Sequence, residues 1–193
     1  GAVDTKSMLR SGLYVGIRND TIFVDPGQEM VYELIVTDVD GNAVAGSDVA
    51  VTMVRLTSVF ADGRWAEAEV DAQSCTVTST LEPVSCAFIP EKGGEYRIRA
   101  EVRDDRERLN RSELTRYVSG SRDVPQRGVA VQEALLIPDQ ESYQPGDVAK
   151  VFVQSPFSPA EGLLIVNHNG IIENRRFTIT DGTTTLEVPI EES

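Results

Sequence analysis

The two cysteines are the residues of this sequence whose type and spacing most directly suggest chemistry. Cys75 and Cys86 lie 11 positions apart, and the sequence between them is centred just before Glu82-Pro83, where a hairpin would turn. Strands folding back there would place the cysteines opposite each other, which suits a cross-strand disulfide. A disulfide would imply an oxidising compartment. Two reduced, half-buried thiols are the alternative.

The single histidine offers no catalytic or zinc-binding partner set. His168 precedes Asn169-Gly170 at an expected hairpin tip, without an adjacent nucleophile, and this is typical of a solvated turn residue. It also lies far in sequence from both cysteines, which argues against zinc. The sequence contains no Gly-x-Ser-x-Gly, His-Glu-x-x-His or phosphate-binding glycine loop. We therefore expect a non-enzymatic protein without catalytic residues or a cofactor.

One acidic segment matches the opening of a calcium-binding loop. Asp38, Asp40 and Asn42 have the required spacing, but Val49 stands where the loop would place its bidentate glutamate. Asp40-Gly41-Asn42 between two apolar runs is also a hairpin signal. The sequence therefore favours a plain turn over calcium, and we expect no metal site.

Composition limits the class of protein. The 193 residues allow one or two domains, and 40% hydrophobic residues suffice for a core. A net charge of −13 argues against nucleic acid as a partner. No apolar run approaches the ~18 residues of a membrane helix. Because the sequence opens Gly1-Ala2-Val3-Asp4, we expect a segment of a larger protein, with any membrane anchor lying outside it.

Two similar corners organise the chain. Tyr143 is followed by Pro145-Gly146 and an apolar strand, and Phe23 is followed by Pro26-Gly27 and another, 119 positions earlier. Proline fixes the φ that a turn needs, and glycine accepts the positive φ that often follows. Repetition at about one domain length suggests two β-domains in tandem.

The remaining pattern predicts strands and no convincing helix. We expect residues 1–12 to be a tail and residues 13–120 an antiparallel β-sandwich of immunoglobulin or fibronectin type, with about seven to eight strands. Its first two strands, 13–17 and 21–24, are expected to pair, as are 66–79 and 84–89. Residues 121–132 read as a linker. Residues 133–193 offer about five strands, so we expect the segment to end within this second domain rather than to form a small half-domain.

The second corner carries a family resemblance. The segment Tyr143–Val151, followed by Gln154-Ser155-Pro156-Phe157, resembles the start of the bait-region domain of bacterial alpha-2-macroglobulins. The same family order then gives three further matches: Leu163-Leu164-Ile165-Val166, Gly170-Ile171 and Val188-Pro189-Ile190. Two departures are Val148, where the family prefers threonine, and Asn167-His168-Asn169, where it has a charged tip. Residues 38–46 and the run from Cys75 to Cys86 are similar to the preceding macroglobulin domain, so the resemblance covers about residues 20–190.

The resemblance implies a broad-spectrum protease trap. In that family a protease cuts an exposed bait segment, the ring of macroglobulin domains collapses and the protease is caged. The implied location is periplasmic, cell-surface or secreted. The implied partners are target proteases, met by the full-length protein, and neighbouring macroglobulin domains. Neither cysteine lies in a Cys-x-x-Gln thioester motif, so this segment would be scaffold.

Two other functions remain open from the sequence. The chain could be a run of immunoglobulin-like repeats from a bacterial surface adhesin or stalk. It could also be an accessory β-sandwich of a secreted hydrolase. The hydrolase reading would place Trp65 and nearby tyrosines on an exposed aromatic platform, whereas an isolated domain favours Trp65 in the core.

Overall fold

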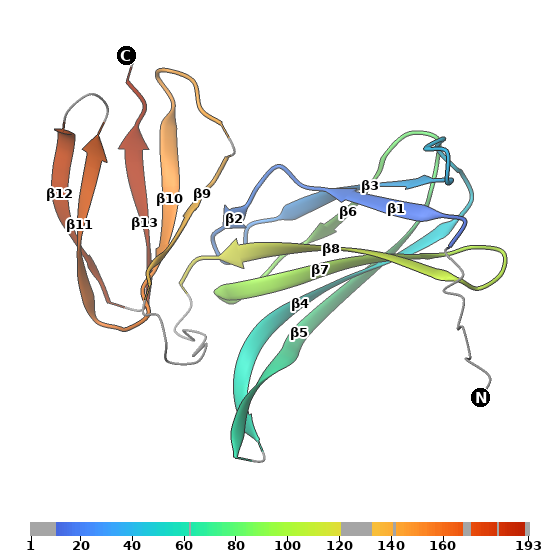
Figure 1. Ribbon diagram of the computed structural model, residues 1–193, viewed down its shortest axis with the longest axis horizontal. Helices are drawn as coiled ribbons and strands as arrows, with labels where there is room; N and C mark the ends of the chain where they lie inside the picture. Colours follow the sequence, from blue (N-terminus) through green and yellow to red (C-terminus); the bar gives the residue numbers. More distant parts are fainter. Residues whose placement is uncertain are drawn as a thin grey trace, which may run out of the picture.

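The computed structural model describes residues 11–61, 63–120, 133–140, 142–167, 171–180 and 182–191. The described chain is all-β, with 13 strands and no helix (Figure 1). Accordingly, no helix within these ranges is long and apolar enough to cross a membrane. The expected all-β class is confirmed. The expected tail and linker fall almost entirely on residues 1–10 and 121–132, outside the described residues.

Strands β1 to β8 form the two sheets of the first unit. One sheet has the order β1-β3-β6, and the other has the order β2-β8-β7-β4-β5. The strands are β1 (Tyr14–Arg18), β2 (Phe23–Val24), β3 (Met30–Thr37), β4 (Asp48–Ala61), β5 (Arg64–Thr78), β6 (Val84–Phe88), β7 (Gly94–Arg103) and β8 (Leu109–Val118). The two sheets enclose a single core.

Alternation along the strands builds this core. Every second side chain of a strand points to the same face, so a regular apolar period buries one face and leaves the other wet. The alternation expected for residues 47–56 and 96–102 is confirmed, because these side chains are all buried: Val49, Val51, Met53, Tyr96, Ile98, Ala100 and Val102. β3 contributes Met30, Tyr32, Leu34 and Val36 from the facing sheet.

The expected pairing of the first two strands was wrong. β1 pairs antiparallel with β3, and β2 pairs parallel with β8 in the opposite sheet. The chain crosses between the sheets at Asn19, which is held from both sides. The side-chain amide of Asn19 donates to the Val31 backbone carbonyl at 2.6 Å, and the Arg116 guanidinium donates to the backbone carbonyl of Asn19 at 2.8 Å. These bonds satisfy the polar groups of a crossover, so a tight hairpin is not needed there.

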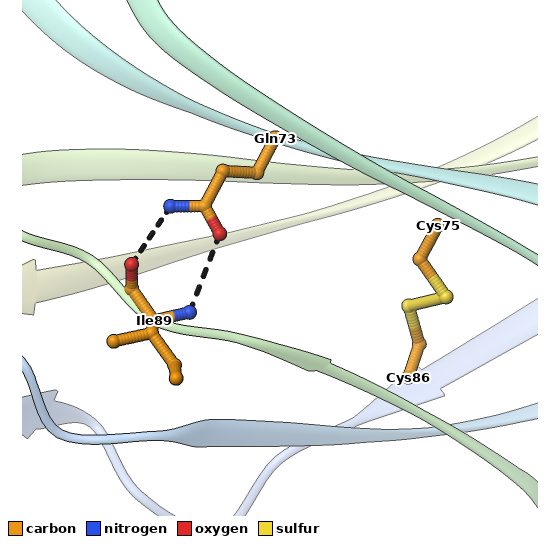
Figure 2. The surroundings of a disulfide bond; sticks show 4 residues. All are labelled: Gln73, Cys75, Cys86 and Ile89. Carbon is orange, nitrogen blue, oxygen red and sulfur yellow. Dashed lines mark hydrogen bonds between the residues drawn. A yellow bond between two sulfur atoms is a disulfide. The ribbon is translucent and has the colours of Figure 1, made fainter.

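Cys75 and Cys86 form a disulfide, but it joins the two sheets instead of two strands of one hairpin. β5 pairs only with β4 among the described strands, and β6 pairs with β3, so the cysteines lie on edge strands of opposite sheets, with Cα atoms 6.4 Å apart. Gln73 reinforces the same seam (Figure 2). Its amide donates to the Ile89 carbonyl at 2.8 Å and accepts from the Ile89 N–H at 3.3 Å. The sequence located the bridge but misassigned the strand pairing.

Reducing this disulfide should destabilise the first unit. Opening a loop of this size restores chain entropy to the unfolded state, worth about 2–3 kcal/mol. Urea unfolding with and without a reductant measures the loss. The Cys75→Ala/Cys86→Ala variant is the control, because its stability should equal that of the reduced protein and should not change when reductant is added. Equal stability of oxidised and fully reduced wild type would contradict the expectation.

Asp104 organises the turn between β7 and β8. Its carboxylate accepts N–H groups from Gly12 at 2.8 Å and from Arg106 and Arg108 at 3.0 Å each, and it pairs with the Arg108 guanidinium at 2.7 Å. The Gly12 hydrogen bond, supported by Arg108, holds the pKa of Asp104 well below its usual range. The turn therefore ties residue 12 to the far end of the β7–β8 hairpin.

Replacing Asp104 should change the acid sensitivity of the fold. The pKa of Asp104 is lower in the folded state than in the unfolded state. Its contribution to the free energy of unfolding is therefore complete above the unfolded-state pKa of about 4 and is lost as the pH falls toward the folded-state pKa. Asp104→Asn should therefore be less stable at pH 7 and lose less stability between pH 5 and pH 3. Urea midpoints across this range measure it. An unchanged pH profile for Asp104→Asn would contradict this expectation.

Strands β9 to β13 form the second unit. Its sheets have the orders β13-β10-β9 and β11-β12. The strands are β9 (Leu135–Pro138), β10 (Val148–Gln154), β11 (Ala160–Asn167), β12 (Ile171–Ile179) and β13 (Thr183–Pro189). The core between the sheets is small, with Val153, Ala160, Ile179 and Leu186 buried.

The second unit repeats the topology of the first part of the first unit. β9, β10 and β13 pair as β1, β3 and β6 do, with β10 and β3 as the middle strands of their sheets. The hairpin β11–β12 then lies between β10 and β13 in sequence, as β4–β5 lies between β3 and β6. The repeat suggested by the two corners therefore extends to the order and pairing of the strands.

Candidate functional site

The two Pro-Gly corners share one hydrogen-bond pattern. Gly27 and Gly146 have φ values of 83° and 94°, in the region that favours glycine. The Gly27 N–H donates to the Pro90 carbonyl at 2.7 Å, and the Gly146 N–H donates to the Ile190 carbonyl at 2.8 Å. Each corner thus ties the start of a central strand, β3 or β10, to the chain leaving its neighbour, β6 or β13. Pro26 and Pro145 lie at equivalent positions in the two turns.

Tyr143 locks the second corner to β9. Its hydroxyl donates to the Asp139 carboxylate at 2.7 Å and accepts from the Gln140 N–H at 3.1 Å. The same Asp139 oxygen accepts the Lys150 N–H at 2.9 Å. Burial, followed by the hydrogen bond to Asp139, raises the pKa of Tyr143. The tyrosine therefore closes a small polar network across the β9–β10 connection.

An apolar cluster joins the two units, and we call it the junction. It consists of the buried side chains of Phe23, Ile137 and Phe152, with Ile22 and Tyr117 packed against them. The Phe152 ring lies 5.6 Å from that of Phe23 and is stacked 6.2 Å from that of Tyr117 (centroid distances). Figure 1 shows the ends of β2 and β8 beside β9 and β10. The junction is the site where the first unit contacts the second.

Phe152 is buried from the side of β10 that faces away from the core of its own unit. Val151 and Val153 pack in that core, so alternation places Phe152 on the opposite face. It is nevertheless only 2% exposed, because the first unit covers it. Its nearest equivalent in the first unit, 119 positions earlier, is the half-buried Glu33. This phenylalanine is therefore specific to the contact between the units.

Backbone hydrogen bonds fix the elements that carry the junction. The Tyr117 N–H donates to the Ile22 carbonyl at 3.1 Å, and the Ser119 N–H donates to the Val24 carbonyl at 3.0 Å, which holds β2 along the end of β8. The Gly120 N–H then donates to the Thr183 hydroxyl of the second unit at 3.0 Å. The junction is thus apolar at its centre, with a direct polar link at its margin.

A cleft of about 1330 Å³ lies beside the junction, between the units. Cations and anions both line it, including Arg18, Arg116 and Lys150 together with Asp20 and Asp139. Charges of both signs do not single out one anionic or cationic ligand. We therefore interpret this cleft as space left between the two units beside the junction, and not as a small-molecule site.

The described residues hold no group of three histidine, cysteine, aspartate or glutamate side chains able to bind a metal ion. The Asp38 carboxylate stabilises the turn that contains it, because it accepts the N–H groups of Asp40 and Asn42 at 2.9 Å each. The hydrogen bond from the Asn42 side chain, followed by that from its N–H, lowers the pKa of Asp38. His168 lies outside the described residues, as does the side chain of Trp65.

The residues singled out from the sequence are thus spread over separate structural roles. The cysteines hold the seam of the first unit, and each corner serves its own sheet. The junction was missed, although β10 carried a signal for it. Val151-Phe152-Val153 is an unbroken apolar run inside an alternating strand, which indicates burial on both faces.

This arrangement consists of two successive immunoglobulin-like β-units, and its most distinctive feature is the contact between them. Comparisons with known proteins show which family this chain resembles. Residues 134–193 match the sequence model of the alpha-2-macroglobulin bait region domain. A curated relative, the alpha-2-macroglobulin homolog of Nostoc sp. (strain PCC 7120 / SAG 25.82 / UTEX 2576), is 26% identical over 163 residues, covering 79% of this chain and 8% of that protein.

Solved structures of bacterial alpha-2-macroglobulins were also found. The native Escherichia coli protein aligns over 94% of this chain and 13% of its own, with 17% identity and a TM-score of 0.42. Salmonella alpha-2-macroglobulin reacted with methylamine aligns over the same shares, with 16% identity and a TM-score of 0.40. Likenesses at this level establish nothing further about this chain.

The domain match and the curated relative confirm the resemblance to bacterial alpha-2-macroglobulins seen in the sequence. The chain spans less than a tenth of the length of the curated relative.

Removing the Phe152 ring should loosen the junction. Truncating a buried phenylalanine to alanine costs about 3–5 kcal/mol, and here the loss falls on the contact between the units. For Phe152→Ala we expect lower stability of the second unit and a broader small-angle X-ray scattering distance distribution. Lys150→Ala, an exposed position on the same face of β10, is the matched control.

Phe23→Ala tests the same contact from the first unit. It removes a ring from the junction while leaving every side chain of the second unit intact. It should broaden the scattering distribution in the same way, even if Phe152→Ala simply unfolds its own unit. A wild-type distribution for Phe23→Ala would show that the junction does not hold the units together.

Proposed function

We propose that this chain is a scaffold segment of a bacterial alpha-2-macroglobulin, a broad-spectrum endopeptidase inhibitor that traps proteases after bait cleavage. The observation that carries the proposal is the match of residues 134–193 to the bait region domain. Members of this family act as protease inhibitors and not as enzymes, which agrees with the lack of a catalytic motif in the sequence. The segment itself performs no catalysis.

The domain organisation follows from the same proposal. Residues 13–120 form a macroglobulin-like β-sandwich, and residues 133–193 form the start of the bait-region domain. Residues 1–12 are a tail and residues 121–132 a linker. The separate cores of the two units support this division.

The junction gives the segment its mechanical role. A contact with three buried side chains and a direct polar link holds two domains in one orientation without fusing their cores. Small contacts between domains permit relative motion when the forces on them change. Such a contact suits a ring of domains that is rigid before bait cleavage and rearranges after it.

Partners and location follow from the family and the disulfide. Target proteases meet the full-length protein, and the segment itself contacts neighbouring macroglobulin domains. A bridge between Cys75 and Cys86 suits an oxidising compartment, so we place the protein in the periplasm, on the cell surface or outside the cell.

The internal repeat also suits a second function, a run of immunoglobulin-like repeats in a surface adhesin or stalk. Tandem units of one topology are the pattern that such stalks share. The bait-region match favours the trap, because it singles out one of the two units, whereas a stalk would have units of one kind.

Exposing the longer parent protein to several unrelated proteases tests the proposal. We expect cleavage concentrated in one segment outside residues 13–193, a compaction visible in native electrophoresis, and a protease that retains activity only on small substrates. Diffuse cleavage at linkers, with no compaction and a fully active protease, would contradict the protease-trap proposal and favour the surface-repeat function.

The isolated chain of 193 residues is the matched control. As scaffold, it should leave the activity of the same proteases on large substrates unchanged. Inhibition by this chain alone would show that it carries an inhibitory site of its own.

A further inference from the structure

The hairpin of β4 and β5 extends beyond the sheet that contains it. The pairing of β4 with β7 ends at Leu56, whereas its pairing with β5 continues to Ala61. We call this extension, residues 57–61 and 64–68, the arm. Figure 1 shows this end of β4 and β5 curving away from the rest of the first unit. Because a two-stranded hairpin is only marginally stable by itself, the arm needs support where it leaves the sheet.

The arm leaves the sheet at a β-bulge. Gln73 of β5 is opposite Met53 of β4. Val70, three positions earlier on β5, is opposite Arg55, only two positions later on β4, so β5 contains an extra residue here. Asp71, within the bulge, has a φ of 53°, in the left-handed region that aspartate adopts more readily than most residues. A bulge bends its strand, so the arm takes its direction from this point.

The Asp71 carboxylate closes the bulge on the core side of the sheet. Arg55 is opposite the buried Tyr96 of β7, at the end of the row of core side chains, and its own side chain is only 12% exposed. A guanidinium so far from water needs an ionic partner. Asp71 supplies it, because its carboxylate accepts the Arg55 Nε–H at 2.8 Å. This hydrogen bond, followed by one from Lys92, lowers the pKa of Asp71 and keeps the carboxylate charged near neutral pH.

The second oxygen of Asp71 reaches the connection between β6 and β7. It accepts a hydrogen bond from the Lys92 ammonium group at 3.0 Å. The Lys92 carbonyl in turn accepts the Tyr96 hydroxyl at 2.7 Å. Gln73 holds the same connection at Ile89 (Figure 2). Asp71 therefore links three elements: β4, β5 and the connection between β6 and β7.

This connection also supports the first corner. The Pro90 carbonyl accepts the Gly27 N–H at 2.7 Å, which fixes the start of β3. Pro90 lies between Ile89 and Lys92, the two residues of the connection that β5 holds. The arm, the connection and the corner are thus joined by a contiguous network, and a force on the arm can reach the middle strand of the opposite sheet.

Ion pairs support the other face of the hairpin. Glu67 of the arm pairs with Arg97 at 2.9 Å, and Glu69 beside the arm accepts from Arg99 at 2.9 Å. The two glutamate side chains are 51% and 36% exposed, and pairs between exposed groups contribute little to stability. The stronger constraint is therefore on the core side, where the Arg55 guanidinium is nearly covered.

We propose that Asp71 pins the arm to the connection between β6 and β7, so that the arm is a rigid lever on the first unit and not a freely moving hairpin. Its direction is set at the bulge, and its movement is transmitted to the first corner. This conformational device goes beyond the proposed function and does not depend on it, because every group in it belongs to the first unit. Failure of either leaves the other standing.

Residual dipolar couplings of the backbone amides, measured on the chain of 193 residues, report the direction of the arm. In the wild type, one alignment tensor should fit the arm and the other strands of the first unit. Asp71→Gly removes the carboxylate but keeps a residue that accepts the positive φ. The arm couplings should then depart from this tensor and fall by about a third or more, while those of β3 and β7 stay unchanged. Arm couplings that still fit the wild-type tensor would overturn the proposal.

Ala72→Gly is the matched control. It adds backbone freedom at the exposed neighbouring position without removing a charged group, so the arm should keep its wild-type couplings. An equal fall in Ala72→Gly and Asp71→Gly would show that freedom of the chain, and not the carboxylate, governs the arm. The proposal would then fail.

Lys92→Met tests the same link from the connection and leaves the bulge intact. Because Arg55 still holds Asp71, the arm couplings should fall, but by less than in Asp71→Gly. The Gly27 amide should exchange about threefold or more faster, because the connection that accepts its hydrogen bond is less firmly held. Wild-type arm couplings in Lys92→Met would contradict the pinning, and unchanged exchange of Gly27 would contradict the transmission to the corner.

Discussion

Burial of Phe152 is the interaction on which the relation between the two units depends. Alternation assigns this side chain to the outer face of β10, where an unpartnered strand would expose it to water. Phe23 and Tyr117 remove it from water instead. Covering a ring of this size contributes about 1.5–3 kcal/mol, which is comparable to a small domain contact and far below the energy of a whole core. The contact can therefore set an orientation without merging the domains.

The corners explain how one chain builds the same sheet twice. A Pro-Gly turn places a glycine N–H against a carbonyl just beyond the neighbouring strand, at Pro90 and at Ile190. This bond fixes where the central strand starts relative to its neighbour, and register in turn decides which side chains face the core. Met30 and Ala149 consequently occupy equivalent buried positions 119 residues apart. The corners determine the register within each sheet, and the junction determines how the two units contact each other.

Strand content and core faces could be predicted because they depend on local periodicity. The alternation around Met53 and Ile98 was sufficient to locate the first core, and the spacing of Cys75 and Cys86 was sufficient to propose their bridge. Strand pairing was less predictable. Whether two consecutive strands share a sheet depends on crossover contacts, such as those of Asn19, which involve residues distant in sequence. The sequence places a strand but does not say on which layer of a sandwich it lies.

The junction shows a different limit. Its residues come from three separate stretches, represented by Phe23, Tyr117 and Phe152, and each stretch alone reads as an ordinary strand. Only the run Val151-Phe152-Val153 departs from alternation, and such a run cannot show which surface covers it. β11 carries the same kind of run in Leu163-Leu164-Ile165-Val166, yet there Leu163 and Ile165 remain 58% and 52% exposed. The two runs share one sequence signal, but among the described residues only the outer face of β10 is covered by the other unit, so the signal alone does not locate a contact.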